Sequence, residues 1–385
     1  MAEKGYNPPH EKSPPETRLF ATAARGTEGA LRDELRELGF RGVRAERGGV
    51  HFAGELAEGA RACLELRTAL RVLYRLDAFP ATEGTALYEG VKALDWSPYL
   101  TAQHTLAVRA VCRDSRITHS QFVAQRTKDA VVDQLRERWG ERPSVDRADP
   151  DLALFVHLVR DVATVYLDLA GESLHRRGYR AQAMEAPLKE SLAAAILRLS
   201  GWDRERPLVD PMCGSGTILI EAALWARRIA PGLLRERFGL ERWACHDEGA
   251  RRGMADLREA AFARILPACP PIFGSDIDPA ALAVATENAR VAGVKVSFRQ
   301  ASVVDLAPLS PPGMVVTNPP YGERLAGSEE LFAAMAGALL ALPGHRVAVL
   351  AGSPAIARAF HHDAARSLAV YNGDIECRLL IVAPG

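Results

Sequence analysis

The sequence contains no long hydrophobic run. None of its apolar stretches approaches the roughly 20 residues that a membrane-spanning helix needs, so an integral membrane protein is not expected. Residues 1–16 are polar and rich in proline, and they lack the apolar core of a signal peptide. We therefore expect a disordered lead-in over 1–16, no membrane partner and a cytoplasmic protein.

The cysteines show no paired spacing. The six of them are scattered, and no two form a Cys-x-x-Cys pair. No cluster of cysteine and histidine has the spacing of a zinc site, so no metal is expected. Reduced thiols of this kind are typical of a cytoplasmic protein.

Lysine is also scarce, and net charge is absent. Lysine occurs at only six positions, arginine supplies the other basic residues, and the formal net charge is zero. Any surface that binds nucleic acid must therefore be a local patch. Its cations would be mainly arginines, which bind phosphate bidentately and stack on bases.

The first 170 residues repeat an α+β pattern. A chain of 385 residues is too long for one compact core, so two or three domains are expected. Over 17–80 the order is strand, helix, strand, strand, helix, strand, with the helices near 27–38 and 55–66, which is the ferredoxin-like pattern. The elements expected over 81–170 are a helix at 87–93, a strand at 105–111, a long helix at 118–140 and a hairpin at 153–169.

Basic side chains gather in this second region. They are Arg109, Arg113, Arg116, Arg126 and Lys128. We expect the long helix to bury Phe122, Ala130, Val131 and Leu135 and to expose its charged residues. Each basic residue taken singly is explained by a solvated helix face, because acids are interleaved. As a set, they predict a surface that contacts phosphate groups.

Residues 171–186 are a polar linker. The linker carries Arg176, Arg177 and Arg180. It is either a plain connection or the lining of a seam between domains, and we favour the seam, where an RNA backbone would lie.

From residue 187 onward strands and helices alternate. Strands are expected near 207–210, 272–276, 294–299, 315–317 and 346–350, with helices at 188–199, 218–226, 280–291, 329–340 and 354–360. A closing hairpin is expected over 368–371 and 376–382, and a helical insertion over 231–270. Such a β-α repeat predicts a doubly wound parallel sheet.

The first strand-to-helix turn is rich in glycine. It comprises Asp210, Pro211, Met212, Cys213, Gly214, Ser215, Gly216 and Thr217. Gly214 and Gly216 allow a positive φ and a close approach of a ligand to the backbone. The turn is not a P-loop, because it lacks the Gly-Lys-Ser/Thr ending. The acidic Asp210 discourages a pyrophosphate and suits a cationic ligand.

The next strand also ends in an acid, Asp276. An acid at this position can bind both hydroxyls of a ribose. The site therefore favours a ribose, an adenine-sized group and a positive charge without a diphosphate, and S-adenosylmethionine has all of these features. Asp278, just before Pro279, is better explained as a helix cap.

Asn318, Pro319, Pro320 and Tyr321 follow a short apolar strand. Two prolines cannot continue a strand ladder, so the chain leaves the sheet there in a stiff turn. The Asn318 side-chain oxygen and the Pro319 carbonyl can each accept one hydrogen of an aryl amine, which aims its lone pair at a methyl group. Tyr321 would stack on the base, which must leave its helical stack to enter.

The two motifs at 210–217 and 318–321, in this order on a β-α repeat, resemble those of class I methyltransferases that modify exocyclic amines of bases. The whole chain resembles the THUMP-containing guanine-N2 methyltransferases, and among them the bacterial 23S rRNA enzymes. The segments that carry this resemblance are 173–180, 186–190, 210–217, 318–325 and 371–373.

The resemblance implies a Rossmann-like, seven-stranded methyltransferase domain over 187–385 and a THUMP RNA-binding domain over 81–170. It implies S-adenosylmethionine as donor and N2-methylguanosine in 23S rRNA as product. In some relatives a second methyltransferase domain follows; this sequence stops at Gly385, so one activity is expected.

The family usually has an acid after the third strand that accepts from the adenine amine. Here that position falls on Ser302, with Asp305 three residues later, and both remain candidates. The expected cofactor-binding set is thus the 210–217 turn together with Asp276, Ile277, Ser302, Asp305 and Asn318.

Two other functions stay open. A tRNA guanine-N2 methyltransferase would share the THUMP module and the Asn-Pro-Pro-Tyr turn. An RNA-binding ribosome-assembly factor could carry a silent methyltransferase fold, although the intact Asp210, Asp276 and Asn318 argue against it. DNA adenine methylation is less expected, because its target does not require the N-terminal module.

Overall fold

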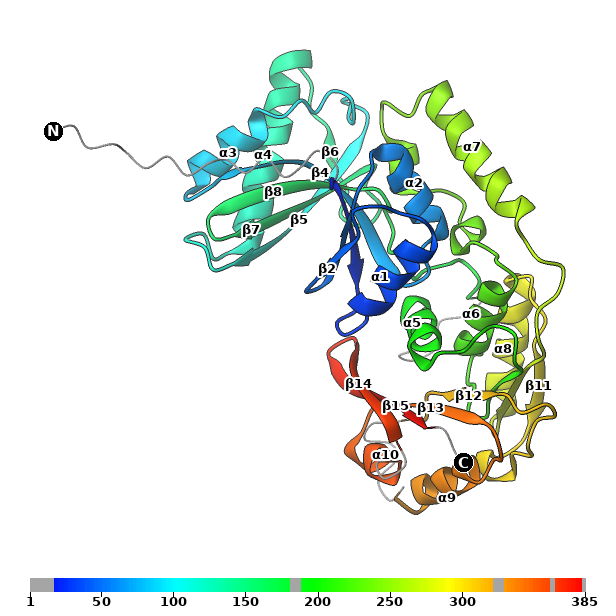
Figure 1. The fold of residues 1–385 in the computed structure, drawn as a ribbon. Helices are drawn as coiled ribbons and strands as arrows, with labels where there is room; N and C mark the ends of the chain where they lie inside the picture. The colour runs from blue at the N-terminus through cyan, green and yellow to red at the C-terminus, as the bar shows by residue number, and fades with distance from the viewer. Residues whose placement is uncertain (1–16, 181–187, 321–328, 361–363, 383–385) are drawn as a thin grey trace.

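Two β-sheets organise the protein, one in each half of the chain (Figure 1). The structure, a computed structural model, describes residues 17–180, 188–320, 329–360 and 364–382. Across these ranges no helix combines the length and the apolar character needed to cross a bilayer.

The N-terminal region begins with the expected ferredoxin-like unit. Its elements are β1 (Leu19–Ala23), α1 (Glu28–Glu37), β2 (Arg44–Glu46), β3 (Gly49–Phe52), α2 (Leu56–Glu65) and β4 (Ala69–Pro80). The strands lie in the order β2-β3-β1-β4. The side chains of β1 alternate between buried and half-buried, because one face of the sheet packs on α1 and α2.

The second unit extends the same sheet. It comprises α3 (Gly84–Lys92), β5 (Thr105–Arg113), α4 (Ser120–Trp139), β6 (Ser144–Val145), β7 (Leu152–Val159) and β8 (Val162–Asp168). β4 pairs with β1 along one edge and with β8 along the other, so eight strands form one sheet in the order β2-β3-β1-β4-β8-β7-β5-β6. The helices of both units share one hydrophobic core.

The prediction that α4 buries Phe122 is wrong. Phe122 is 47% exposed, whereas Ala130, Val131 and Leu135 are buried as expected. Phe122 lies in the first turn of α4, and Val123 beside it faces the core instead.

The C-terminal region is the expected doubly wound domain. Its elements are α5 (Glu190–Ser200), β9 (Leu208–Asp210), α6 (Thr217–Ala226), β10 (Ile272–Asp276), α8 (Pro279–Val291), β11 (Ser297–Gln300), β12 (Met314–Thr317), α9 (Glu329–Leu340), β13 (Arg346–Ala351), α10 (Pro354–Ala359), β14 (Ala364–Asn372) and β15 (Ile375–Val382). The strand order is β11-β10-β9-β12-β13-β15-β14, and only β15 runs antiparallel to its neighbours. Helices cover both faces, with one core cluster on each side.

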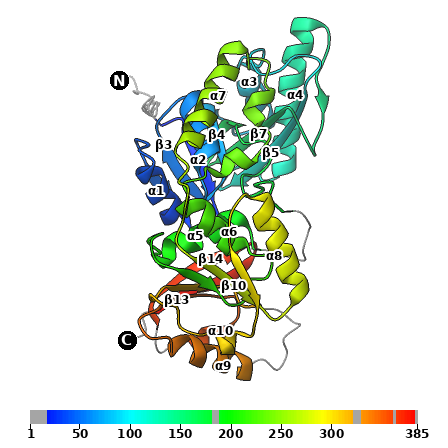
Figure 2. The same ribbon diagram turned by 90° about the vertical axis from the view of Figure 1, so that its right-hand side faces the viewer.

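The insertion between α6 and β10 is helical, as expected. It contains two 3-10 turns, η1 (Pro231–Leu234) and η2 (Gly239–Arg242), and the helix α7 (Glu248–Ala263). It packs on the N-terminal region, where Phe238 and Trp243 are buried in that core and the Trp243 ring lies 5.4 Å from the ring of Tyr99. Figure 2 shows α7 beside the N-terminal strands, above α5 and α6.

A buried polar cluster joins the two regions. The Arg67 side chain donates to the carbonyl oxygens of Leu224 and Ile229 at the end of α6, the second at 2.5 Å. Burial lowers the pKa of Arg67 to about 10, so the side chain keeps its charge at neutral pH. Arg177 donates to the Arg67 carbonyl and lies 3.4 Å from the Glu221 carboxylate on α6.

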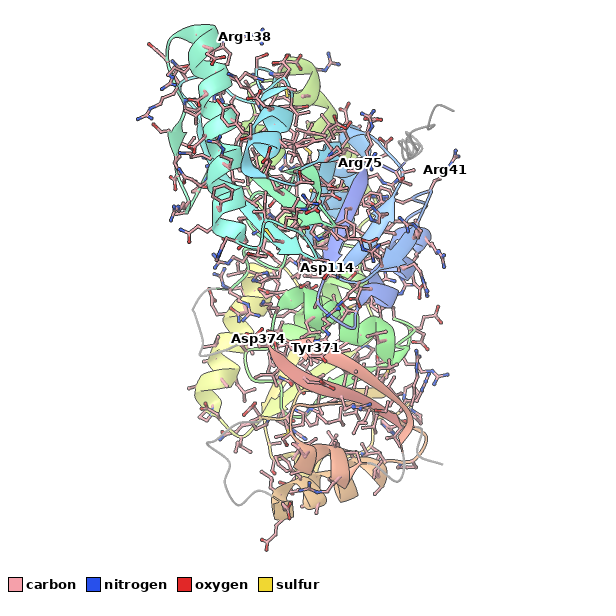
Figure 3. All side chains as sticks on the ribbon, turned by 90° about the vertical axis from the view of Figure 1, so that its left-hand side faces the viewer. Arg41, Arg75, Asp114, Arg138, Tyr371 and Asp374 are labelled. Carbon is pink, nitrogen blue, oxygen red and sulfur yellow. The ribbon has the colours of Figure 1, made fainter. Side chains whose placement is uncertain are left out.

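The hairpin of β14 and β15 makes a second contact between the regions. The Tyr371 N–H donates to the Arg25 carbonyl at 3.1 Å, and the Arg25 guanidinium lies 4.1 Å from the centre of the Tyr371 ring. Figure 3 shows Tyr371 and Asp374 on this hairpin, below the N-terminal region.

Candidate active site

Three polar side chains follow neighbouring parallel strands at one edge of the C-terminal sheet. Asp210 ends β9, Asp276 ends β10 and Asn318 follows β12, and β9 lies between the other two. Ligands of doubly wound sheets bind outside the carboxyl ends of the strands, where the strand order reverses. The order places β9 at that reversal, because the chain goes from β9 to β10 and β11 on one side and to β12 on the other.

The glycine-rich turn folds tightly against this edge. Gly214 and Gly216 adopt φ values of 51° and 80°, in the left-handed region that favours glycine. The Cys213 N–H donates to the Ser275 carbonyl at 3.0 Å, which holds the turn to β10. A Cβ atom on Gly216 would lie 3.1 Å from the Ala285 Cβ, so a larger residue would push the turn away from α8.

Asp276 anchors the turn as well. One of its carboxylate oxygens accepts from the Gly214 N–H at 2.9 Å, and the other accepts from the Asp278 N–H at 3.0 Å. Each oxygen can accept a further hydrogen bond. Asp278 caps α8 as expected, since its side chain accepts from the Ala280 N–H. The neighbouring Ile277 is 70% exposed, an apolar surface beside the acid.

Asp210 is buried at the centre of the edge. Its carboxylate accepts from the Thr317 hydroxyl at 2.7 Å and from the Met212 N–H at 3.1 Å. Burial, with a smaller contribution from the nearby Asp276 charge, raises its pKa to about 7, although the two hydrogen bonds lower the pKa. A cation near this carboxylate would favour its charged form. Sequence reasoning missed Thr317, although its place before Asn318 at a strand end was the available signal.

Asn318 carries an unsatisfied acceptor. Its Oδ1 atom is buried and has no hydrogen-bond partner within the described ranges. The residue follows β12, and Pro319 beside it is buried while Pro320 is exposed. A buried polar atom without a partner costs free energy, so this oxygen is suited to accept from a ligand. Tyr321, the expected stacking ring, lies outside the described residues.

Ser302 precedes the 3-10 turn η3 (Val303–Asp305) that follows β11, and Asp305 is its last residue. The Ala301 N–H donates to the Asp276 carbonyl at 3.1 Å. Ser302 is the next residue in the chain, so it begins beside Asp276 at the carboxyl edge of the sheet. Asp305 is one turn further on and is exposed, whereas Ser302 is half-buried. Both stay candidates for the adenine amine.

The five basic residues predicted to form one phosphate-contacting surface do not do so. Arg109, Arg113 and Arg116 are exposed on β5 and in the loop after it. Arg126 and Lys128 belong to α4, which covers the opposite face of the sheet. Arg126 lies 4.6 Å from the centre of the Tyr88 ring, and Lys128 pairs with Asp129 at 2.5 Å. Because side chains alternate along β5, Arg109 and Arg113 point away from the face that α4 covers. The sequence alone does not show which face of the strand the helix covers.

The linker arginines also differ from expectation. Only Arg176 is exposed, and it pairs with Glu172 at 2.7 Å. Arg177 is 1% exposed and holds Glu221, so it is a structural residue of the seam and not an RNA contact. Arg180 is mostly buried, pairs with Glu190 at 2.6 Å and donates to the Thr217 hydroxyl at 3.3 Å. A single sequence does not distinguish a buried, paired arginine from an exposed one.

Comparison with known families covers almost the whole chain. Residues 177–381, more than half of the sequence, match the family model described as "RMKL-like, methyltransferase domain". This chain belongs to the RMKL-like methyltransferase family. Its N-terminal half matches the RlmL ferredoxin-like domain over 18–73 and the THUMP domain over 81–168.

Individual relatives agree with the family match. The ribosomal RNA large subunit methyltransferase K/L of Syntrophotalea carbinolica is 44% identical over 94% of this chain and 53% of its own length. The chain thus spans about half the length of the curated relatives it matches.

Solved structures show the same fold. The crystal structure of SMU.472, complexed with SAH, has a TM-score of 0.84 and 32% identity, covering 96% of this chain and 99% of that one. A protein of Listeria monocytogenes, described as a predicted N6-adenine-specific DNA methylase, also has a TM-score of 0.84, with 33% identity and 96% coverage of both chains. The C-terminal domain is therefore a class I methyltransferase fold.

Proposed function

We propose that this chain transfers a methyl group from S-adenosylmethionine to the exocyclic N2 of a guanine in 23S rRNA. The observation that carries the proposal is the Asn318 Oδ1 at the carboxyl end of β12, which is buried and has no hydrogen-bond partner among the described residues. It lies one strand away from the glycine-rich turn and from Asp210, a buried carboxyl whose charged form a nearby cation would stabilise. The relatives named as large-subunit rRNA methyltransferases support the choice of RNA.

The residues of the donor site would each have a separate task. Asp276, with one acceptor position left on each oxygen, would bind the two ribose hydroxyls. Asp210 would complement the positive charge, and Gly214 and Gly216 would let the donor lie against the backbone. Ile277 would pack on one face of the adenine, and Ser302 or Asp305 would accept from its amine. The other residues of the turn would shape this surface; they are Pro211, Met212, Cys213, Ser215 and Thr217.

S-adenosylmethionine supplies the methyl group and, through its sulfonium, the driving force. In the acceptor site the Asn318 Oδ1 and the Pro319 carbonyl would each accept one N2 hydrogen and disperse the positive charge that develops on nitrogen. The Asn318 side chain is neutral and cannot act as a general base. The N2 proton would therefore be lost after the N–C bond has formed, and Tyr321 would stack on the flipped base.

The experiment is label transfer from a methyl-labelled donor to deproteinised 23S rRNA, bulk tRNA or duplex DNA, followed by nucleoside analysis. We expect N2-methylguanosine in 23S rRNA alone. Label only in tRNA would show the tRNA enzyme, and N6-methyladenine in DNA would match the description of the Listeria relative. The absence of label from all three, with intact RNA binding, would favour the assembly factor.

A further inference from the structure

Among the residues that the structure describes, no helix packs on one face of the N-terminal sheet. Along β7, Leu152, Leu154, Val156 and Leu158 are buried in the core under the helices, so Ala153, Phe155 and His157 point to the other side. The same alternation places Arg109 and Arg113 of β5 on that other side, because Val108 and Ala110 pack on the core. In Figure 1, α3 and α4 lie above β5, β7 and β8, and no helix lies beneath these strands.

Four residues on this face form a row across four strands. The register pairs Arg75 of β4 with Tyr166 of β8, Tyr166 with Phe155 of β7, and Phe155 with Arg109 of β5. The row therefore reads arginine, ring, ring, arginine, with the two ring centres 6.5 Å apart. Tyr166 is only 8% exposed, so it supports Phe155 from the side, and Phe155 is the ring of the row that a base could reach. Arg109 is exposed and makes no salt bridge within the part of the chain that the structure describes.

Further rings lie on the same face. His157 is two residues along β7 from Phe155, with the ring centres 6.5 Å apart. In the ferredoxin-like unit, Phe20 and His51 are register partners on β1 and β3 with ring centres 4.7 Å apart. Phe155, His157, Phe20 and His51 are all partly exposed. Partly exposed rings beside arginines match unpaired nucleic acid, because bases stack on the rings and arginines bind the phosphates.

The face continues into a groove that leads toward the methyltransferase domain. A cavity of about 740 Å³ is lined by Arg109 and Ala153 of the sheet, by the linker and by the insertion, including Arg176 and Arg237. Its described lining has seven arginines against three carboxylates. One of the seven, Arg177, is buried against Glu221, and the other six still outnumber the acids. The linker then reaches the donor-site turn, where Arg180 donates to the Thr217 hydroxyl at 3.3 Å.

We propose that the helix-free face of the eight-stranded sheet, centred on the Arg75–Tyr166–Phe155–Arg109 row, binds an unpaired segment of the substrate RNA. The segment then passes through the groove between linker and insertion. The proposal rests on the proposed function for the identity of the substrate. It assigns the insertion a role as a wall of the RNA path, and it requires both N-terminal units to form one binding surface.

The test is binding of a fluorescent single-stranded RNA of mixed sequence by the full chain, measured by anisotropy at several salt concentrations. Phe155→Leu keeps an apolar side chain and removes the ring, and Arg109→Ala removes an exposed cation. We expect each to weaken binding about tenfold, in the range of base stacking and charge-assisted contacts. Arg109→Ala should also reduce the salt dependence of binding.

Matched controls come from the helical side of the same sheet. Phe122 on α4 is 47% exposed, and Arg138 near the end of α4 has a half-exposed side chain, so Phe122→Leu and Arg138→Ala should leave affinity unchanged. Equal losses in the test and control variants, or unchanged binding by both Phe155→Leu and Arg109→Ala, would overturn the proposal. So would tighter binding of a blunt duplex than of the single strand.

Label transfer to 23S rRNA separates this proposal from the function on which it rests. If wild type methylates rRNA but the two variants bind RNA normally, only the binding face is wrong. If the wild-type protein methylates none of the substrates, but Phe155→Leu and Arg109→Ala still weaken RNA binding, the face is an RNA site and the catalytic proposal fails.

Discussion

Donor binding should depend on pH through Asp210. Its pKa of about 7 means that the buried carboxyl is about half charged at neutral pH. The charged fraction falls to about one in eleven at pH 6 and rises to about ten in eleven at pH 8. If the cationic donor binds the charged form, its apparent Kd is inversely proportional to that fraction. The Kd should therefore increase about tenfold from pH 8 to pH 6.

The pH dependence of folding stability has the opposite sign to the pH dependence of donor binding. A carboxyl whose pKa is raised on folding destabilises the fold as it ionises, so the ligand-free protein loses stability as the pH rises from about 4 to about 7. A difference of about three pKa units corresponds to about 4 kcal/mol. The donor should offset part of this loss, and its thermal stabilisation of the protein should be larger at pH 8 than at pH 6.

Calorimetric titration with S-adenosylmethionine at pH 6, 7 and 8 measures the effect. Asp210→Asn is the control, because an amide can still accept from Thr317 but does not titrate. Its affinity should be weaker than that of wild type at pH 8 and constant across the range. A flat wild-type profile, or the same slope in Asp210→Asn, would refute the assignment of the titration to this carboxyl.

Three further substitutions test the other roles. Asn318→Ala should reduce turnover at least about 100-fold, because it removes a hydrogen-bonding group at the nitrogen where charge develops. The Kd for S-adenosylmethionine should change by no more than about twofold. A parallel loss of S-adenosylmethionine affinity in calorimetry would place Asn318 in the cofactor site instead. Asp276→Ala should weaken donor binding about 10- to 100-fold, the range for hydrogen bonds to a charged group, and an unchanged Kd would rule out the ribose contact. Arg177→Met should destabilise the protein by about 3–5 kcal/mol in denaturant unfolding because it leaves Glu221 buried without its partner, whereas the double variant with Glu221→Met should recover much of the loss.

Periodicity predicted most of the elements of the C-terminal domain. β10 and α9 have the predicted bounds, because a buried apolar run ends at an acid in the first case and an apolar helix pattern is bounded by Glu329 and by Leu340 in the second. The turn at 210–217 was predicted from its glycines, whose positive φ values the structure shows. These features depend on local sequence, which a single chain displays directly.

Features that depend on packing between distant segments were not predicted. The sequence shows that Arg177 is a cation, but not that it is buried and paired with Glu221, 44 positions away. Arg109 and Arg126 were grouped by their proximity in sequence, although a strand and a helix place them on opposite faces of one sheet. Helical periodicity does not decide which of two adjacent apolar residues faces inward, so it wrongly predicts that Phe122 lies in the core.

The pairing of β4 with both β1 and β8 has a consequence for how the N-terminal half can evolve and be divided. The twelve residues of β4 supply the last strand of the ferredoxin-like order and the neighbour of the THUMP hairpin at once. A protein cut within or just after this strand would leave one fragment with a bare sheet edge, which is prone to aggregate. We expect the two units to unfold in a single cooperative transition, and loss of either unit in evolution should leave the other with an exposed sheet edge.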